Sequence, residues 1–313
     1  GGAVLAGTLT TPENCTDDTP VVVLVSGSGQ QNRDEELFEH KPFAVIADYL
    51  ARNGIASLRY DDRGVGGSTG EVVEATTADF AGDATAALDW LRGRGRFGKT
   101  GIIGHSEGGL IACMTGAAEG GPDFIVSVAG PAIKGTRTIA YQNKVALMKS
   151  GVDENTAEDF RAAIERALEY KLAHPAATEL PDADLALLYP QHDLDDMTRK
   201  LAASIRGMFV PGDPNRWMLW FLAYDPAADL KALDIPAMLI YGEKDRQVPP
   251  ALNKTMAEEL APAAIVKEYP GLNHLMQHAA TGDVEEYVTI EETISPEVLA
   301  DIVSFIGKVT SKD

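Results

Sequence analysis

Apolar runs alternate with amphipathic helical segments along most of this chain, and this alternation restricts the possible folds more than any other feature. The run "VVVLVSGSG" (21–29) is continuously apolar, which suits a strand buried on both faces of a sheet. The segment that follows, "PFAVIADYLARNG" (42–54), repeats its apolar residues at helical spacing and stops at Gly54. Repeated strand–helix alternation predicts an α/β fold with a mostly parallel, doubly wound sheet covered by helices on both faces.

The remaining elements follow from the same patterns. The alternating segment "AVLAGTLTTP" ends in proline and predicts an edge strand near the N-terminus. The helix expected within 75–95 has Thr77 as its expected N-cap. Further strands are expected within 55–64, 99–106, 123–131, 236–245 and 264–274, and further helices within 107–118, 250–261 and 295–309.

The alternation is interrupted once, because residues 136–222 contain no convincing strand. The stretch 157–173 has apolar side chains at i, i+4 spacing and predicts an amphipathic helix. About 85 helical residues cannot belong to the sheet. We therefore expect a core formed by 1–134 and 226–313, with a helical cap, 135–225, inserted late in the sheet.

Composition excludes several classes of function. Lys and Arg total 27 and Asp and Glu total 47, and the resulting net charge of −20 argues against nucleic acid as a partner. No apolar run approaches the roughly 18 residues that a membrane span needs. Two cysteines, Cys15 and Cys113, are too few for a zinc site or a disulfide framework, and we expect free thiols. The chain begins Gly-Gly without Met, so it looks trimmed, and cytoplasmic and periplasmic or secreted locations are not distinguished.

One serine lies in a glycine-rich turn, "GHSEG" (104–108), at the end of an expected buried strand and the start of an expected helix. Gly104 and Gly108 fit this turn because side chains would clash where the strand and the helix nearly touch. The context is that of a nucleophile elbow, in which a strained backbone exposes the serine hydroxyl. Ser106 is therefore the candidate nucleophile.

A serine needs a base to remove its proton, and the base needs a carboxylate to orient it. Asp245 follows one later strand and His274 follows the next, in the chain order that the elbow requires. Glu243, two residues nearer the strand, is the alternative acid, and His278 is the alternative base. His105 adjoins the serine, but we expect its side chain to point away from the cleft. The other histidines, which we expect to be solvated, are His40, His174 and His192.

The tetrahedral intermediate of acyl transfer needs two backbone donors. One is expected at Glu107, which follows the serine and opens a helix whose dipole favours negative charge. The other is expected from the loop "SGSGQQNRDE", with Ser28 as the first choice and Gly29 as the second. The carboxylate of Glu107 is interpreted as a favourable first-turn charge rather than a substrate contact.

Two further groups of residues have structural or substrate-binding interpretations. Four charged residues in the loops, Arg33, Asp34, Asp61 and Arg63, are expected to act as mutual salt bridges and backbone braces. The aromatic residues that close the expected cap, Trp217, Trp220, Phe221 and Tyr224, are expected to divide between cap core and pocket wall. Gly29, Trp217, Trp220 and Phe221 are the candidate residues of the substrate pocket.

The ordered set "VSGSGQQNRDE", "RYDDRGVGGSTG", "GHSEGG", "GEKDRQVP" and "NH" resembles the α/β-hydrolase superfamily over about residues 5–310. Within it the chain is similar to capped bacterial carboxylesterases and serine-aminopeptidase-like hydrolases. The resemblance implies a triad of Ser106, Asp245 and His274, oxyanion donors at Ser28 and Glu107, and no metal or organic cofactor. The chain departs from the commoner pattern at Ser26-Gly27, where many members have His-Gly.

The function expected from these residues is hydrolysis of small carboxylic esters with short acyl chains through a covalent acyl-enzyme. A peptidase or an acyl-thioesterase would use the same triad and remains an alternative. A non-catalytic binding protein on this fold is an alternative of another class. The sequence does not indicate the oligomeric state.

Overall fold

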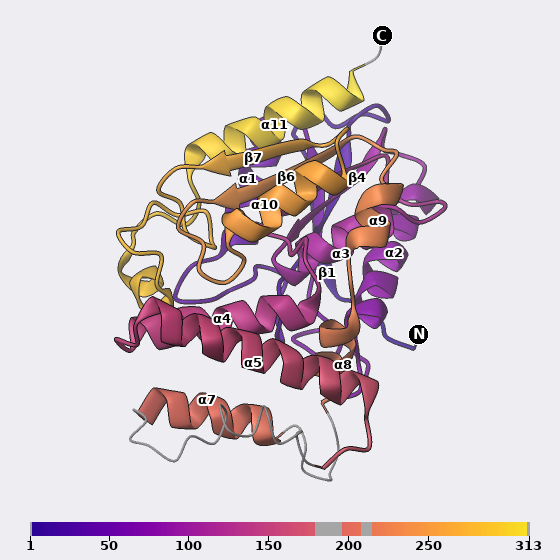
Figure 1. Ribbon diagram of the computed structural model, residues 1–313. Coiled ribbons are helices and arrows are strands. Elements are labelled where there is room, and N and C mark those ends of the chain that lie inside the picture. Colours follow the sequence, from indigo (N-terminus) through magenta and orange to yellow (C-terminus); the bar gives the residue numbers. More distant parts are fainter. Residues whose placement is uncertain (1, 179–195, 208–214, 312–313) are drawn as a thin grey trace. The chain divides into compact units, whose positions relative to one another are not determined.

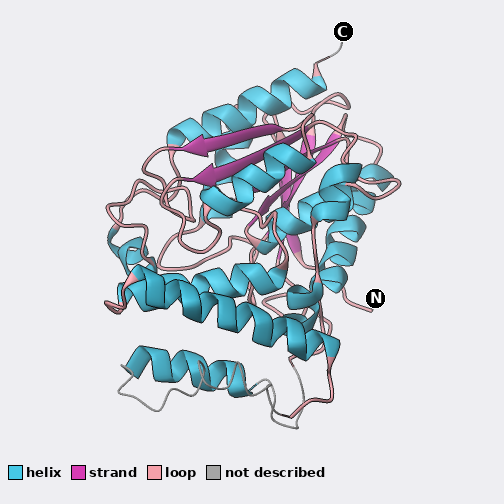
Figure 2. Ribbon diagram, viewed as in Figure 1, coloured by secondary structure: helices cyan, strands magenta, loops and turns pink. Residues whose placement is uncertain are grey.

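The chain folds into two compact units, Gly1–Ala132 with Pro226–Asp313, and Ile133–Asp225. The structure is a computed structural model that describes residues 2–178, 196–207 and 215–311. His192 lies outside the described residues. Figures 1 and 2 show the helices and strands of both units.

The first unit contains a seven-stranded sheet in the order β1-β3-β2-β4-β5-β6-β7 (Figure 1). Its strands are β1 (Gly7–Thr10), β2 (Val21–Val25), β3 (Ala56–Tyr60), β4 (Thr100–His105), β5 (Phe124–Val128), β6 (Ala237–Gly242) and β7 (Ile265–Tyr269). Only β1 runs antiparallel, on β3 at one edge, and all other neighbours are parallel. The predicted mostly parallel α/β fold and its N-terminal edge strand are confirmed.

Helices cover both faces of the sheet, as the doubly wound pattern predicts (Figure 2). One face carries α1 (Pro42–Arg52) and α11 (Pro296–Thr310), and the other carries α2 (Thr77–Gly93), α3 (Glu107–Gly116), α9 (Ala227–Ala232) and α10 (Pro250–Leu260). Side chains of β2 alternate between the two faces: Val22 and Leu24 pack with the first set of helices, and Val21, Val23 and Val25 with the second. This strand is therefore buried on both sides, which explains its continuous apolar run.

The N-cap of α2 is Thr76 rather than the expected Thr77. The backbone N–H of Thr76 donates to the Asp79 carboxylate at 2.9 Å, and the Thr76 hydroxyl donates to the same oxygen at 2.8 Å. An acidic residue three positions after a threonine stabilises such a start, because it satisfies a donor that the helix leaves without a partner. Thr77 is the first helical residue, and its hydroxyl is used elsewhere.

The described residues of the second unit form helices joined by loops, and none of them forms a strand. Its helices are α4 (Gly135–Lys149), α5 (Glu154–Ala173), α7 (Asp196–Gly207) and α8 (Arg216–Ala223). The helix expected over 157–173 begins three residues earlier, because Asp153 caps it by accepting from the N–H groups of Asn155 and Thr156. Phe160, Ile164 and Leu168 form the predicted apolar face and are buried in this unit's own core.

Candidate active site

Ser106 is the single residue between β4 and α3, and its backbone is strained, with φ 55° and ψ −117°. A non-glycine residue at positive φ costs of order 1–3 kcal/mol unless its surroundings impose it. The crowding is visible at the two flanking glycines. A Cβ at Gly104 would lie 1.9 Å from the Gly108 carbonyl oxygen, and a Cβ at Gly108 would lie 2.0 Å from that of Val25. The turn therefore requires glycine at both positions.

Asp245 and His274 follow β6 and β7, so the carboxyl ends of two neighbouring parallel strands bring them together. The ring Nδ1 of His274 lies 2.7 Å from Asp245 Oδ2, and the two side chains are 5% and 0% exposed. The other carboxylate oxygen accepts from the backbone N–H groups of Gln247 and Val248, each at 2.8 Å. The carboxylate is thus fixed on Nδ1, which directs the proton to that nitrogen and leaves Nε2 as an acceptor.

The alternative acid and base residues lie in other contacts. Glu243 accepts from the backbone N–H of Gly271 at 2.7 Å. The ring of His278 is 61% exposed and lies 2.9 Å from a Glu292 carboxylate oxygen. Neither of them takes part in the contact between Asp245 and His274.

His40 is buried, which corrects the expectation that it is solvated. Its two ring nitrogens contact the Thr293 hydroxyl at 3.0 Å and the Tyr287 carbonyl at 2.9 Å. Both contacts span more than 240 residues of sequence, so no local pattern indicates them. His174 is exposed and stacks on Tyr170, with ring centroids 4.3 Å apart.

Glu35 and His105 form a buried pair that sequence reasoning missed. The ring Nδ1 of His105 lies 2.9 Å from Glu35 Oε1, and that oxygen also accepts from the Gly27 N–H at 2.7 Å. The ring Nε2 contacts the backbone carbonyl of His274 at 3.0 Å. Nothing in the loop "QNRDE" singles out Glu35, because its partner lies 70 residues away in the sequence.

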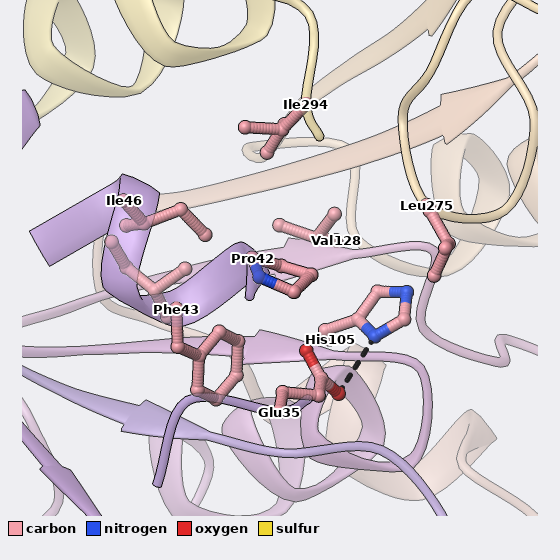
Figure 3. A pocket seen from close by; sticks show the side chains of 9 residues that line it. Glu35, Pro42, Phe43, Ile46, His105, Val128, Leu275 and Ile294 are labelled. Carbon is pink, nitrogen blue, oxygen red and sulfur yellow. Dashed lines mark hydrogen bonds and ion pairs between the residues drawn. The ribbon is translucent and has the colours of Figure 1, made fainter. Parts of the chain in front are cut away.

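A small cavity of about 10 Å³ adjoins this pair (Figure 3). That volume is the room which the centre of about one water molecule needs. Its lining is mostly apolar: Pro42, Phe43, Ile46, Ile103, Val128, Leu275 and Ile294, together with Glu35 and His105. Among the described residues, the second carboxylate oxygen of Glu35 has no hydrogen-bond partner. The hydrogen bonds of the Glu35 carboxylate in the described chain therefore fall on Oε1.

Asp62 holds both ends of the loop that contains Ser28 and Gly29. Its Oδ1 accepts from the Ser26 hydroxyl at 2.9 Å, and its Oδ2 accepts from the Gln31 N–H at 2.9 Å. Ser26 stands where many family members have histidine. Its hydroxyl thus links the loop that contains Ser28 to the loop that follows β3, which contains Asp62. Burial raises the pKa of Asp62 to about 7. The two hydrogen bonds lower this pKa, whereas the negative charges of Glu35 and Glu107 raise it.

The charged loop residues form salt bridges and brace the backbone, as expected, and two of them find partners outside this group. Arg33 pairs with Asp61 at 2.6 Å, Arg59 pairs with Asp34 at 2.7 Å, and Arg63 pairs with Asp83 on α2 at 2.7 Å. Side chains of adjacent residues leave the backbone in different directions, so each charge finds a partner on another segment. The guanidinium of Arg33 lowers the pKa of Asp61 to about 2, although burial opposes this shift.

The side chain of Glu107 is buried in the first turn of α3, where it accepts from the Thr77 hydroxyl at 2.6 Å. A carboxylate at this position is favoured by the helix dipole. The contact also ties α3 to the first residue of α2.

Comparison with known proteins identifies the family to which these features belong. Residues 22–286 match the family described as "Alpha/beta hydrolase family". This chain belongs to the alpha/beta hydrolase family. The turn at Ser106 and the pair after β6 and β7 therefore lie in a hydrolase scaffold.

This alpha/beta hydrolase is 29% identical over 278 residues to the esterase EstD of Thermotoga maritima. The match covers 87% of this chain and 58% of EstD, so this chain spans little more than half the length of that relative. Among solved structures, Est1E of Butyrivibrio proteoclasticus with bound ferulic acid has a TM-score of 0.58 at 15% identity, covering 99% and 97% of the two chains. A proline iminopeptidase of Mycobacterium smegmatis also has a TM-score of 0.58, at 17% identity, covering 99% and 96%. At these identities the two structures establish the fold only.

The aromatic residues of α8 and of its C-cap, Tyr224, stack in pairs within the second unit. Trp217 lies on Phe221 with ring centroids 5.4 Å apart, and Trp220 lies on Tyr224 with centroids 4.5 Å apart. Phe221 is buried, and both tryptophans are half-buried. Their part in a substrate pocket stays a prediction.

The described part of the chain holds no candidate metal centre and no membrane-spanning helix. No cluster of three or more His, Cys, Asp or Glu side chains there is arranged to hold a metal ion. No helix in residues 2–178, 196–207 and 215–311 is long and apolar enough to cross a membrane. Cys15 and Cys113 are free thiols, and burial raises the pKa of Cys113 to about 12, so that thiol is unreactive.

Proposed function

We propose that this alpha/beta hydrolase cleaves carboxylic esters, with Ser106 as nucleophile, His274 as base and Asp245 as the acid that orients the base. The contact between Asp245 and Nδ1 of His274 carries the proposal, because it leaves Nε2 as a proton acceptor. The strained turn at Ser106 is the second support, since such strain is retained where function requires it. The esterase EstD, similar over most of this chain, supports the reaction class.

In the proposed reaction the Ser106 hydroxyl oxygen attacks the ester carbonyl carbon while its proton passes to Nε2 of His274. The resulting tetrahedral intermediate carries an oxyanion. Its collapse breaks the bond to the alcohol oxygen, which takes the proton from His274 and leaves an acyl group on Ser106. Water then attacks this acyl-enzyme with the same base and releases the acid.

The oxyanion donors in this proposal are the backbone N–H groups of Glu107 and Ser28, with Gly29 as the second choice in the loop. Glu107 opens α3, so its amide and the helix dipole would both favour negative charge. Gly27 is a poorer candidate, because its N–H already donates to Glu35. The two bonds of Asp62 would keep the Ser28 segment rigid.

We propose a small ester with a short acyl group as the substrate. The bulky rings Trp217, Trp220 and Phe221 at the end of the helical insertion support a short pocket, with Gly29 allowing close approach from the loop. Peptide and thioester substrates use the same residue types, so a substrate panel separates these possibilities.

The test combines covalent labelling with that panel. A fluorophosphonate probe should label the wild-type protein once, and Ser106→Ala should abolish labelling and lower esterase activity by more than about 10³-fold. Ser304→Ala, which changes an exposed serine of α11, is the matched control and should behave as wild type. Labelling that survives in Ser106→Ala contradicts the proposal. Faster hydrolysis of aminoacyl anilides or acyl-thioesters than of nitrophenyl esters would assign peptidase or thioesterase activity, and no hydrolysis at all would indicate a binding protein.

A further inference from the structure

The second acid–histidine pair, Glu35 with His105, lies between three parts of the proposed site. Glu35 accepts from Gly27, the residue before Ser28. His105 immediately precedes Ser106 in the chain, and its ring contacts the backbone carbonyl of His274. The rings of His105 and His274 lie side by side, with centroids 4.8 Å apart.

We propose that Glu35 and a doubly protonated His105 act as a positioning pair, which fixes the backbone of His274 and the oxyanion loop relative to Ser106. This inference rests on the proposed function of Ser106 and His274. Neither Glu35 nor His105 would touch the substrate.

When Glu35 is ionised, the two contacts of the His105 ring require two N–H groups. A backbone carbonyl only accepts hydrogen bonds, so Nε2 of His105 must carry a proton to bond to His274. A neutral ring would then present a lone pair on Nδ1 to Glu35 Oε1, 2.9 Å away, where two acceptors repel each other. An imidazolium facing a carboxylate satisfies both contacts and leaves the buried pair neutral overall.

The surroundings of the pair favour this protonated state. Burial lowers the pKa of His105. The charge and hydrogen bond of Glu35, the His274 carbonyl and the charge of Asp245 all raise it, and together they outweigh burial, so the net pKa is raised. The titratable groups around the pair are Asp62 beyond Glu35, Asp245 and the ring of His274, with Glu107 acting on Asp62. The protonated state of His105 should therefore persist to higher pH than that of an ordinary histidine.

Because the cavity lies next to Glu35, the carboxylate depends on His105 and Gly27 for its hydrogen bonds within the described chain. Among the described residues, the second carboxylate oxygen has no partner and points into the apolar space in Figure 3. When His105 loses its proton, Glu35 keeps only the Gly27 amide in the described chain. The link between the oxyanion loop and His274 is then broken at its centre.

The first measurement is the charge state of His105 by 15N NMR of histidine-labelled wild-type protein, with the signal assigned by its loss in His105→Gln. We expect both ring nitrogens of His105 to be protonated at pH 7.5 and the proton to be lost at higher pH. An unprotonated Nδ1 at pH 7.5 would overturn the proposal. This measurement needs no turnover, so it stands even if Ser106 fails the labelling test above.

The second measurement is the kinetics of Glu35→Gln. The amide oxygen can still accept from Gly27, but without the charge the ring becomes neutral and loses one of its two contacts. We expect kcat to fall about 10–100-fold with KM within about twofold, because small misplacements of catalytic groups act on the rate. The wild-type rate should fall at alkaline pH as His105 loses its proton, and this alkaline limb should be absent in Glu35→Gln.

The matched control is Asp301→Asn, which also removes a carboxylate from an ion pair, with Lys267, away from this network. It should retain the wild-type kcat and alkaline limb. Thermal unfolding of both variants shows whether they are folded. A folded Glu35→Gln variant with wild-type kcat and an unchanged alkaline limb would overturn the positioning role, whatever the NMR result.

Discussion

Asp61 and Asp62 are neighbours in the chain, yet their carboxyl groups occupy opposite electrostatic environments. Asp61 accepts from the Arg33 guanidinium and from the N–H groups of Arg33 and Gly67, and its pKa is lowered to about 2. Asp62 accepts from the Ser26 hydroxyl and the Gln31 N–H, neither of which is charged, and burial raises its pKa to about 7. The pKa of each carboxyl group is thus set by the groups that it meets, and these depend on the direction in which its side chain leaves the backbone.

The free energy of unfolding should therefore respond to Asp62→Asn in a pH-dependent way. The folded pKa of Asp62 lies above its unfolded value, so its contribution is present at low pH and is lost as the pH rises through about 7. Asparagine imitates the protonated acid, and the variant should equal wild type near pH 4 and exceed it by more than about 1 kcal/mol at pH 8. Urea unfolding at several pH values measures the difference.

Asp61→Asn is the matched control, with the opposite sign. The folded pKa of Asp61 lies below its unfolded value, so its contribution is present at neutral pH and is lost as the pH falls through about 2. This variant should be destabilised by about 1–3 kcal/mol at pH 7, because it loses a charge-assisted hydrogen bond. Equal pH dependence in the two variants would contradict these assignments.

At the scale of elements, the nucleophile turn depends on how closely β2, β4 and α3 approach one another. The α3 helix is buried on nearly all sides and packs on the sheet rather than presenting one apolar face. Its first turn lies so close to the end of β2 that Gly108 has no room for a side chain. The glycines of "GHSEGG" thus report the packing of a whole helix, not only the turn.

Gly108→Ala should test this packing. The new Cβ would lie 2.0 Å from the Val25 backbone oxygen, which cannot move without disturbing a central strand. We expect destabilisation of more than about 4 kcal/mol, or failure to fold.

Gly82→Ala, within α2, is the matched control, because a Cβ there meets no atom within 4 Å. It should stabilise the protein by about 1 kcal/mol, since alanine favours a helix over glycine. Thermal and denaturant unfolding measure both variants. A Gly108→Ala protein as stable as wild type would show that the helix can move away from β2.

At the scale of the whole molecule, the chain separates into a sheet unit and a helical unit, each with its own core. The site contacts described above lie within the sheet unit, where β4, β6 and β7 end. Substrate size is the property for which we expect the helical unit to matter, through the rings of α8.

We predict that the protein prefers esters of short acyl groups, in the range from acetyl to butyryl, and that Trp220→Ala moves the optimum to longer acyl chains. A pocket gains about 0.8 kcal/mol per buried methylene until the chain meets a wall. A series of nitrophenyl esters of increasing length measures the profile. Trp90→Ala, which removes a half-exposed ring from α2, is the control and should leave the profile unchanged. An unchanged profile in Trp220→Ala would show that its ring only packs within the helical unit.

Much of the fold and the main candidates for the site followed from local sequence patterns. The apolar run of β2 and the helical spacing of α1 predicted the layered sheet. A strand buried on both faces is continuously apolar, and a helix buried on one face repeats its apolar residues at helical spacing. The elbow at Ser106 was predictable because its glycines and serine form a short motif at the junction of a strand and a helix, although the clash that requires Gly108 is with Val25, far earlier in the chain. Asp245 and His274 were predictable because residues at the ends of parallel strands converge at one edge of the sheet.

Tertiary structure alone decided which polar side chains are partners. Glu35 meets His105, Asp62 holds both ends of the Ser28 loop, and His40 is buried on residues more than 240 positions away. These contacts leave no period and no motif, because each depends on the direction in which one side chain leaves a loop. Sequence determined the sheet and the residue types at its edge, since backbone sterics and burial act over a few neighbouring residues. The charge and hydrogen-bond partners of those residues are decided only when distant loops meet, because electrostatic contacts depend on distance in space and not on separation along the chain.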